Sequence, residues 1–212
     1  MFTVVTVAVA VALLALSAAP AAALVIQLGD QDFANGAITP LFNPPSAGEP
    51  APFDGFRGDD NNTNFSESWT FVFAPGAHAA ASITIGIFDH DSASPGSQLA
   101  SFGFDGNDLT GALDTLFESS GGAQLEVNVY TLALSAAALG DLADGSATFT
   151  LTLQGPTLSG LGAVLASNGA GLDFSSLALD TGGRLPFPAT LPLLGAGLAG
   201  ALAVARRRAT RP

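Results

Sequence analysis

Ser82-Ile83-Thr84-Ile85-Gly86-Ile87 (residues 82–87) alternates isoleucine with small or polar residues. Successive side chains of a β-strand point to opposite faces, so a period of two is typical of a strand with one face on a hydrophobic core. An amphipathic helix would instead repeat every three to four residues. Residues 82–87 therefore predict a half-buried strand.

The same alternation recurs along the middle of the chain, where turns rich in Gly, Asp, Asn and Pro separate the repeats. It covers residues 69–73, 101–104, 125–134, 148–153 and 177–179. Six or more such segments predict a mostly β fold, an antiparallel β-sandwich of jelly-roll-like type. Two short helical pieces interrupt them, one over 109–117 after the possible caps Asn107 and Asp108, the other over 136–142.

The segment before the first clear strand is irregular. Prolines stand at positions 40, 44, 45, 50 and 52, and a helix cannot form at that density. The short apolar pieces 24–26 and 38–42 are candidate edge strands. Residues 58–64 read Gly-Asp-Asp-Asn-Asn-Thr-Asn, which predicts a turn rich in side-chain oxygens.

The charge of the chain is strongly one-sided. The 18 acidic residues all lie within residues 24–183, where Arg57 is the one basic residue, which gives this segment a formal charge of −17. Such a segment repels phosphate groups, so we expect no nucleic-acid partner. The chain contains no cysteine. Its fold must therefore be held by the core without disulfides.

The two ends of the chain differ in composition from the part between them. Val4 to Leu16 is an apolar run, and Ala21-Ala22-Ala23 forms a cleavage site before Leu24, which predicts a secretory signal peptide over residues 1–23. Residues 184–212 contain three parts in order. These are Leu185-Pro186-Phe187-Pro188-Ala189, an uncharged run from Leu191 to Ala205, and the cluster Arg206, Arg207 and Arg208.

The uncharged part is suited to a membrane. Leu185 to Ala205 holds no ionisable side chain, and its length is near the roughly 20 residues that a spanning helix needs. The arginine cluster should hold its end in the cytoplasm. The sequence therefore predicts one C-terminal transmembrane helix, with residues 24–183 on the other side of the membrane. An ordinary C-terminal anchor is the alternative.

The order of these three parts resembles the PEP-CTERM class of bacterial sorting signals, and most closely its VPLPA variant, with Leu185–Ala189 in place of that pentapeptide. The resemblance covers the tail alone. It implies that the tail is recognised by an exosortase, a membrane transpeptidase that cuts near the proline motif and passes the protein to the cell surface or to a surface polymer.

Two acidic clusters are candidates for a cation. Asp89 and Asp91 follow one strand, and Asp105, Asn107 and Asp108 follow the next, so a hairpin of these two strands would bring them together. Carboxylate and amide oxygens are the ligands of Ca²⁺, although the EF-hand register is absent. Plain turn chemistry is the alternative. The turn at 58–64 is a weaker candidate of the same kind.

Motifs for enzyme chemistry are absent from the sequence. No cysteine nucleophile, G-x-S-x-G elbow or H-E-x-x-H zinc motif is present. A pair formed by Asp89 or Asp91 with Asp105 could serve glycoside hydrolysis, but nothing in the sequence favours it. His90 is expected to be a solvated loop residue. Trp69 and Tyr130 are expected to pack in the core, with sugar stacking as the alternative.

These observations predict an exported, non-enzymatic bacterial protein with three parts: a signal peptide (1–23), a β-sandwich ectodomain (24–183) and a sorting signal (184–212). It would be anchored in the membrane by its C-terminus and then reach the cell surface or extracellular matrix. Its partners would be an exosortase-like enzyme and exopolysaccharide, in a structural role. The alternative function is a calcium-dependent carbohydrate-binding module tethered to the membrane.

Overall fold

The computed structural model describes residues 23–40 and 48–182. The chain divides into two units, of which Ala22–Gly182 contains these residues. The predicted signal peptide, sorting motif and transmembrane helix lie outside them. Within the described residues, no helix has the length and apolarity to cross a membrane.

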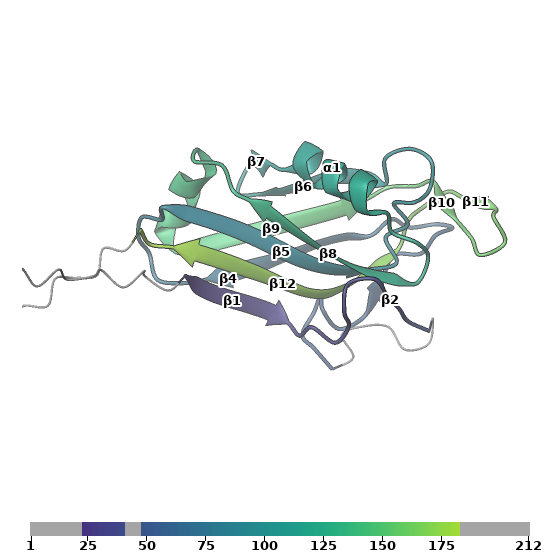
Figure 1. Ribbon diagram of the computed structural model, residues 1–212, viewed down its shortest axis with the longest axis horizontal. Helices are drawn as coiled ribbons and strands as arrows, with labels where there is room; N and C mark the ends of the chain where they lie inside the picture. Colours follow the sequence, from purple (N-terminus) through teal and green to yellow (C-terminus); the bar gives the residue numbers. More distant parts are fainter. Residues whose placement is uncertain (1–22, 41–47, 183–212) are drawn as a thin grey trace, which may run out of the picture. The chain divides into compact units, whose positions relative to one another are not determined.

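The described part is mostly β, with antiparallel sheets (Figure 1). The larger sheet has the order β1-β12-β5-β8-β2, with β3 also paired to β12, and the smaller has the order β4-β9-β6-β7. The larger sheet consists of β1 (Leu24–Gly29), β2 (Ala37–Ile38), β3 (Phe56–Arg57), β5 (Ala80–Phe88), β8 (Glu126–Ala133) and β12 (Ala170–Asp180). The smaller consists of β4 (Ser66–Val72), β6 (Leu99–Phe104), β7 (Asn107–Asp108) and β9 (Ser146–Leu153). A separate hairpin joins β10 (Thr157–Leu158) and β11 (Val164–Leu165).

The period-two segments are strands, as predicted from their alternation. In β5 the three isoleucines are fully buried, and in β9 Phe149, Leu151 and Leu153 are also fully buried. The apolar faces of both sheets contribute to one hydrophobic core. A hydrogen bond of 3.0 Å from Trp69 Nε1 in β4 to Ser175 Oγ in β12 joins the two sheets inside it. The sheets therefore pack on each other through these buried faces.

Aromatic rings fill the centre of this core. Phe149 lies in contact with four of them, at centroid distances of 5.0 Å to Phe104, 5.9 Å to Phe71, 6.0 Å to Phe102 and 6.1 Å to Trp69. Offset-stacked and edge-to-face ring pairs add to the energy of burial. Phe149 is thus the hub that joins the three long strands of the smaller sheet.

Strand pairing corrects one prediction. The strands around Ile83–Ile87 and Phe102–Phe104 do not form a hairpin, because β5 pairs with β12 and β8, and β6 pairs with β9 and β7. The chain crosses from the larger to the smaller sheet between β5 and β6. The residues after β5 and after β6 are consequently brought to different places.

The short helices lie close to where the sequence predicts them. Helix α1 spans Thr110–Ser120 and buries Leu113 and Phe117, and the second piece is a 3₁₀-helix, η1, over Ala138–Asp144. The predicted caps are wrong, because the N-cap of α1 is Leu109, without a side-chain cap. Asp108 instead accepts a hydrogen bond of 2.9 Å from the N–H of Thr110. Figure 1 shows α1 beside β6.

Candidate functional site

The outer face of the smaller sheet carries serine and threonine hydroxyls in register. Alternation turns the apolar residues of β4 and β9 inward, so their polar residues face out. Cross-strand hydroxyl pairs form at Ser66–Thr152 (3.0 Å), Ser68–Thr150 (2.9 Å) and Thr70–Thr148 (2.9 Å). We call these six residues the hydroxyl face. Each hydroxyl keeps hydrogen-bonding capacity beyond its cross-strand bond.

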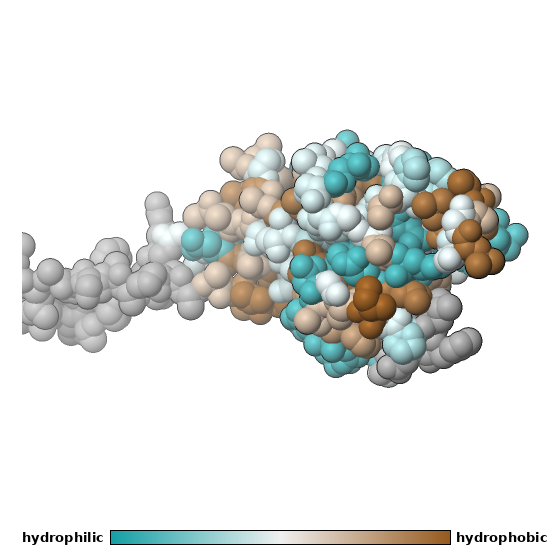
Figure 2. Space-filling view, turned by 45° about the vertical axis from the view of Figure 1, so that its right-hand side comes forward, coloured by the Kyte–Doolittle hydropathy of each residue, from teal (hydrophilic) through white to brown (hydrophobic). Residues whose placement is uncertain are grey.

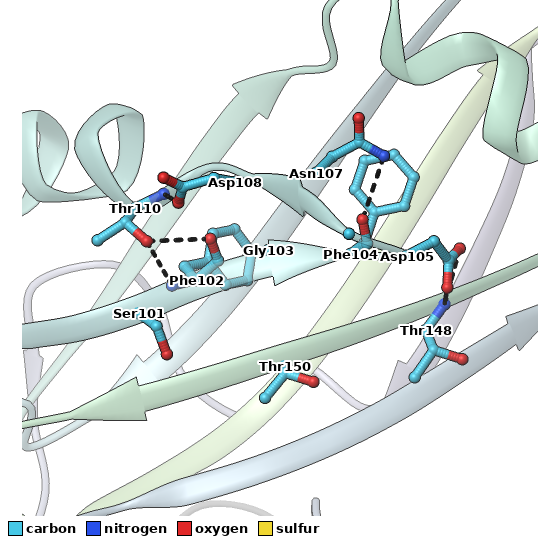
Figure 3. A pocket seen from close by; sticks show the side chains of 11 residues that line it. Ser101, Phe102, Gly103, Phe104, Asp105, Asn107, Asp108, Thr110, Thr148 and Thr150 are labelled. Carbon is cyan, nitrogen blue, oxygen red and sulfur yellow. Dashed lines mark hydrogen bonds between the residues drawn. The ribbon is translucent and has the colours of Figure 1, made fainter.

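A pocket of about 300 Å³ adjoins the hydroxyl face where β6 turns into β7 (Figure 3). Its walls include Thr148 and Thr150 of the hydroxyl face and Ser101 of β6. Three further polar residues line it: Asp105 of the turn, and Asn107 and Asp108 of β7. Neutral hydroxyls, one amide and two carboxylates thus gather around one hollow. These groups can exchange hydrogen bonds with a polyhydroxylated ligand.

The polar side chains of Asp105, Asn107 and Asp108 are held in place by β9, β6 and the start of α1. Asp105 accepts a hydrogen bond of 3.3 Å from the N–H of Thr148, and Asn107 Nδ2 donates to Phe104 O at 3.2 Å. Hydrogen bonds from the side chain and backbone of Thr110 lower the pKa of Asp108. Asp108 is therefore ionised at neutral pH and can act as an acceptor.

Trp69 and Tyr130 do not form part of this pocket. Both side chains are buried, Trp69 against Phe149 and Tyr130 against Phe117. The prediction that they pack in the core is confirmed, and neither offers a ring face for sugar stacking. Any ligand of the hydroxyl face would be held by hydrogen bonds and small apolar contacts.

His90 is buried, and the prediction of a solvated loop residue is wrong. Its Nε2 lies 3.1 Å from Asn128 Oδ1 and 2.9 Å from Tyr130 OH, and its ring packs against Phe117 at 4.3 Å. Burial lowers the pKa of His90 to about 4, partly offset by the hydrogen bond with Asn128. The ring is therefore neutral at pH 7 and serves as a core residue in this loop.

Asp89 and Asp91 flank His90 and are almost completely buried. Both adopt left-handed backbone conformations, with φ of 57° and 49°, which aspartate tolerates better than most residues. Burial is the main cause that raises the pKa of Asp89 to about 6 and that of Asp91 to about 7; repulsion from Asp60 contributes to both values, and repulsion from Asp89 contributes to that of Asp91. Thr157 Oγ1 donates a hydrogen bond to Asp91 Oδ2, which partly opposes this rise.

The five residues predicted as one cation site fall into two groups. Asp105 bonds to Thr148 near the start of β9, whereas the loop with Asp89 and Asp91 lies at the other end of that strand, near Leu153. The five residue steps of strand from Thr148 to Leu153 span roughly 17 Å. This separation also exceeds the reach of a carboxylate pair for glycoside hydrolysis. In residues 23–40 and 48–182, no three His, Cys, Asp or Glu side chains form a ready-made metal site.

Two neighbours of Asp89 and Asp91 were not predicted to lie beside them, although the turn 58–64 that contains Asp60 was a separate, weaker cation candidate. Asp60 comes from the turn at 58–64, and Asn168 lies two residues before the start of β12. Asn168 Nδ2 donates to His90 O at 2.8 Å. The Asn-Gly step at 168–169 is a turn signal, but no sequence rule places it beside residue 90. The sorting motif Leu185–Ala189 and the arginines 206–208 lie outside the described residues.

Comparisons with protein-family models, with curated proteins and with solved structures find no match for this chain. The candidate sites therefore rest on the sequence and on the geometry above.

Proposed function

We propose that this chain is an exported bacterial envelope protein whose tail, residues 184–212, is the sorting signal for an exosortase-like enzyme. The observation that carries the proposal is the order of parts in the tail: the proline motif Leu185–Ala189, then an uncharged run, then Arg206–Arg208. In this proposal the chain is the substrate of the sorting enzyme and has a structural or exopolysaccharide-associated role after sorting.

The described part supports a role as a separate extracellular unit. It encloses its own hydrophobic core, and its first and last long strands are neighbours, with Leu24 paired to Leu179. Removal of residues before Leu24 and after about Gly183 would therefore leave both new chain ends close together and the core complete. A surface that carries almost only acidic charge also suits a protein outside the cell that stays soluble.

We further propose that this unit is a β-sandwich of jelly-roll type. The strand orders β1-β12-β5-β8 and β4-β9-β6-β7 support this, because the chain moves repeatedly from one sheet to the other. Double-sheet jelly rolls are built in this way and include lectin domains.

The sorting proposal is tested by the intact mass of the mature protein from its native host, measured separately in membrane and surface fractions. We expect loss of the chain beyond the Leu185–Ala189 region, with or without an added group. Replacing Pro186 and Pro188 by alanine should leave the tail uncut. The matched control, Pro192→Ala, changes a proline outside the motif and should be processed normally. A wild-type mass that retains Arg206–Pro212 in the membrane would make the tail an ordinary anchor.

A calcium-dependent carbohydrate-binding module is the second candidate function. The pocket beside the hydroxyl face favours it, since hydroxyls, an amide and two carboxylates converge there. The acidic surface repels anionic polymers, so the ligand should be a neutral polysaccharide. Glycan-array binding with and without Ca²⁺ tests this, with Thr150→Val as the variant and the Thr131→Val change on the other sheet as control. Absence of binding by the wild-type chain would leave the structural role.

A further inference from the structure

Hydrogen bonds bring the segments that carry three carboxylates and one amide near one another at the end of the core near Leu153, without gathering the carboxylates into a ready-made metal site. We call this group the acidic corner: Asp60, Asp89, Asp91 and Asn168. Asp89 and Asp91 flank His90, whose carbonyl accepts a hydrogen bond from Asn168 Nδ2, and the next residue, Gly169, donates its N–H to Asp60 Oδ1 at 3.1 Å. Three segments distant in sequence, the 58–64 turn, the loop after β5 and the start of β12, therefore meet here.

One oxygen of each carboxylate in the acidic corner is held by the protein. Asp89 Oδ1 accepts the N–H of Leu125 at 2.5 Å, Asp91 Oδ2 accepts the hydroxyl of Thr157, and Asp60 Oδ1 accepts the N–H of Gly169. The second oxygen of each makes no hydrogen bond with the residues that the structure describes. The carboxylates are thus oriented while each keeps one oxygen available.

The amide of Asn168 supplies an independent indication of a ligand. Asn168 is fully buried, and its Oδ1 has no hydrogen-bond partner among the described residues. The amide is oriented correctly, because His90 O can only accept and must face the nitrogen. A buried acceptor without a partner costs on the order of 1–3 kcal/mol. A cation beside Asp60, Asp89 and Asp91 would satisfy this oxygen.

The negative charge of the acidic corner has no basic partner in the described residues. Arg57 is the one basic residue of the segment 24–183, and it pairs with Asp54 and, at 3.4 Å, with Glu67. Repulsion among the carboxylates adds to their burial in raising the pKa of Asp89 and of Asp91. Buried charges are normally paired or bound to metal.

We propose that the acidic corner binds one Ca²⁺ ion through Asp60, Asp89, Asp91 and the Oδ1 of Asn168. Ca²⁺ takes six to eight oxygens in flexible geometry, so these four side chains and water can complete its shell, whereas Mg²⁺ demands a near-ideal octahedron. The three carboxylates are not yet gathered as a ready-made site. Asp60 is half-buried on a surface turn, and in this proposal it is the ligand that moves inward when the ion binds.

Titration of the full-length chain in non-ionic detergent tests this proposal, with calcium chloride added after removal of metals by EDTA. Calorimetry should give one Ca²⁺ per chain, and magnesium chloride should bind at least tenfold more weakly. At a Ca²⁺ concentration 100 times Kd, Tm should rise by about 5–10 °C. A wild-type Tm that is the same in EDTA and in excess Ca²⁺ would overturn the proposal.

Matched variants locate the ion. Asp60→Asn should weaken Ca²⁺ binding at least tenfold, and Asp60→Asn with Asp91→Asn should abolish it, while Tm in EDTA stays at or above that of the wild type. Glu118→Gln with Asp144→Asn, two exposed positions outside every site proposed above, is the control and should bind as the wild type does. Wild-type affinity in the Asp60 variant, or loss of binding in the control, would refute the site. If the double variant does not fold, the Ca²⁺ affinity of the Asp60→Asn variant alone decides whether the acidic corner is the site. This test is independent of sorting.

Discussion

Replacing Asp91 by asparagine should stabilise the protein at pH 8 and leave its stability unchanged at pH 4. Asp91 is 3% exposed, and burial raises its pKa from 3.8 to about 7. Asparagine has nearly the same shape and can still accept the hydrogen bond from Thr157 through its amide oxygen. The variant therefore removes the charge while it keeps the packing of the loop after β5.

The sign of the effect follows from the proton balance. Between pH 4 and pH 7 the folded state holds a proton on Asp91 that the unfolded state has lost, so unfolding releases a proton and the free energy of unfolding falls as pH rises. The contribution is complete below the unfolded pKa near 3.8 and is lost as pH rises through about 7. The difference between the two pKa values corresponds to a loss of about 4 kcal/mol in the free energy of unfolding. Screening by solvent and shared repulsion with Asp60 and Asp89 reduce the expected gain at pH 8 to about 2 kcal/mol.

Other titratable groups of the same region also affect how the stability of the wild type depends on pH. The pKa of Asp60 and of Asp89 is also raised, which adds to the loss of stability at high pH, whereas the lowered pKa of His90 has the opposite effect between about pH 4 and pH 6.5. The difference between variant and wild type isolates Asp91 from these groups to a first approximation. It should grow from near zero at pH 4 to its full value at pH 8.

Urea unfolding of the full-length chain in EDTA, at five pH values from 4 to 8, measures this difference. Glu118→Gln on the exposed face of α1 is the control and should run parallel to the wild type at all pH values. A constant difference between Asp91→Asn and wild type from pH 4 to pH 8 would refute the reasoning. Asp91 would then have the same pKa in the folded and unfolded states.

Three further changes probe the core by urea unfolding. Phe149→Ala should cost about 4 kcal/mol, since it removes the ring in contact with four others, and a loss below 1 kcal/mol would exclude its role as hub. Trp69→Phe and Ser175→Ala should each cost about 1–2 kcal/mol and be non-additive together; additive losses would show that their hydrogen bond carries no energy. Gly86→Ala places a Cβ 2.4 Å from the ring of Phe174 and should cost about 1–3 kcal/mol, whereas an unchanged Tm would mean that the ring moves freely aside.

Alternation predicted which segments are strands because it reports directly on burial. The buried positions of β4, β5 and β9 coincide with the apolar positions of the pattern, as in Trp69, Ile85 and Phe149. The proline-rich segment also behaves as expected where it is described, since Leu24–Gly29 and Ala37–Ile38 form strands at the two edges of the larger sheet. Side-chain periodicity thus predicted the buried faces, and the short apolar pieces predicted the edge strands.

Strand partners could not be predicted, because a period of two says nothing about which strand lies alongside. β5 pairs with β12, whose register joins Ile83 to Leu177, almost a hundred residues away. The hairpin expected between β5 and β6 assumed that strands adjacent in sequence pair with each other. It does not form, because the chain crosses from one sheet to the other between them. Every prediction that depended on that hairpin, including the joint site of Asp89 with Asp105, failed with it.

The crossing of the chain between the sheets also explains why residue types alone did not predict the acidic corner. Aspartate and asparagine in a loop normally indicate exposed turns. The loop after β5, however, turns at the end of the core, where α1 and β8 cover it, and His90 packs between Phe117 and Tyr130. Polar residues there are buried by segments that come later in the chain. A buried carboxylate without a basic partner is therefore a property of the assembled fold, and it is the kind of feature at which an ion is to be sought.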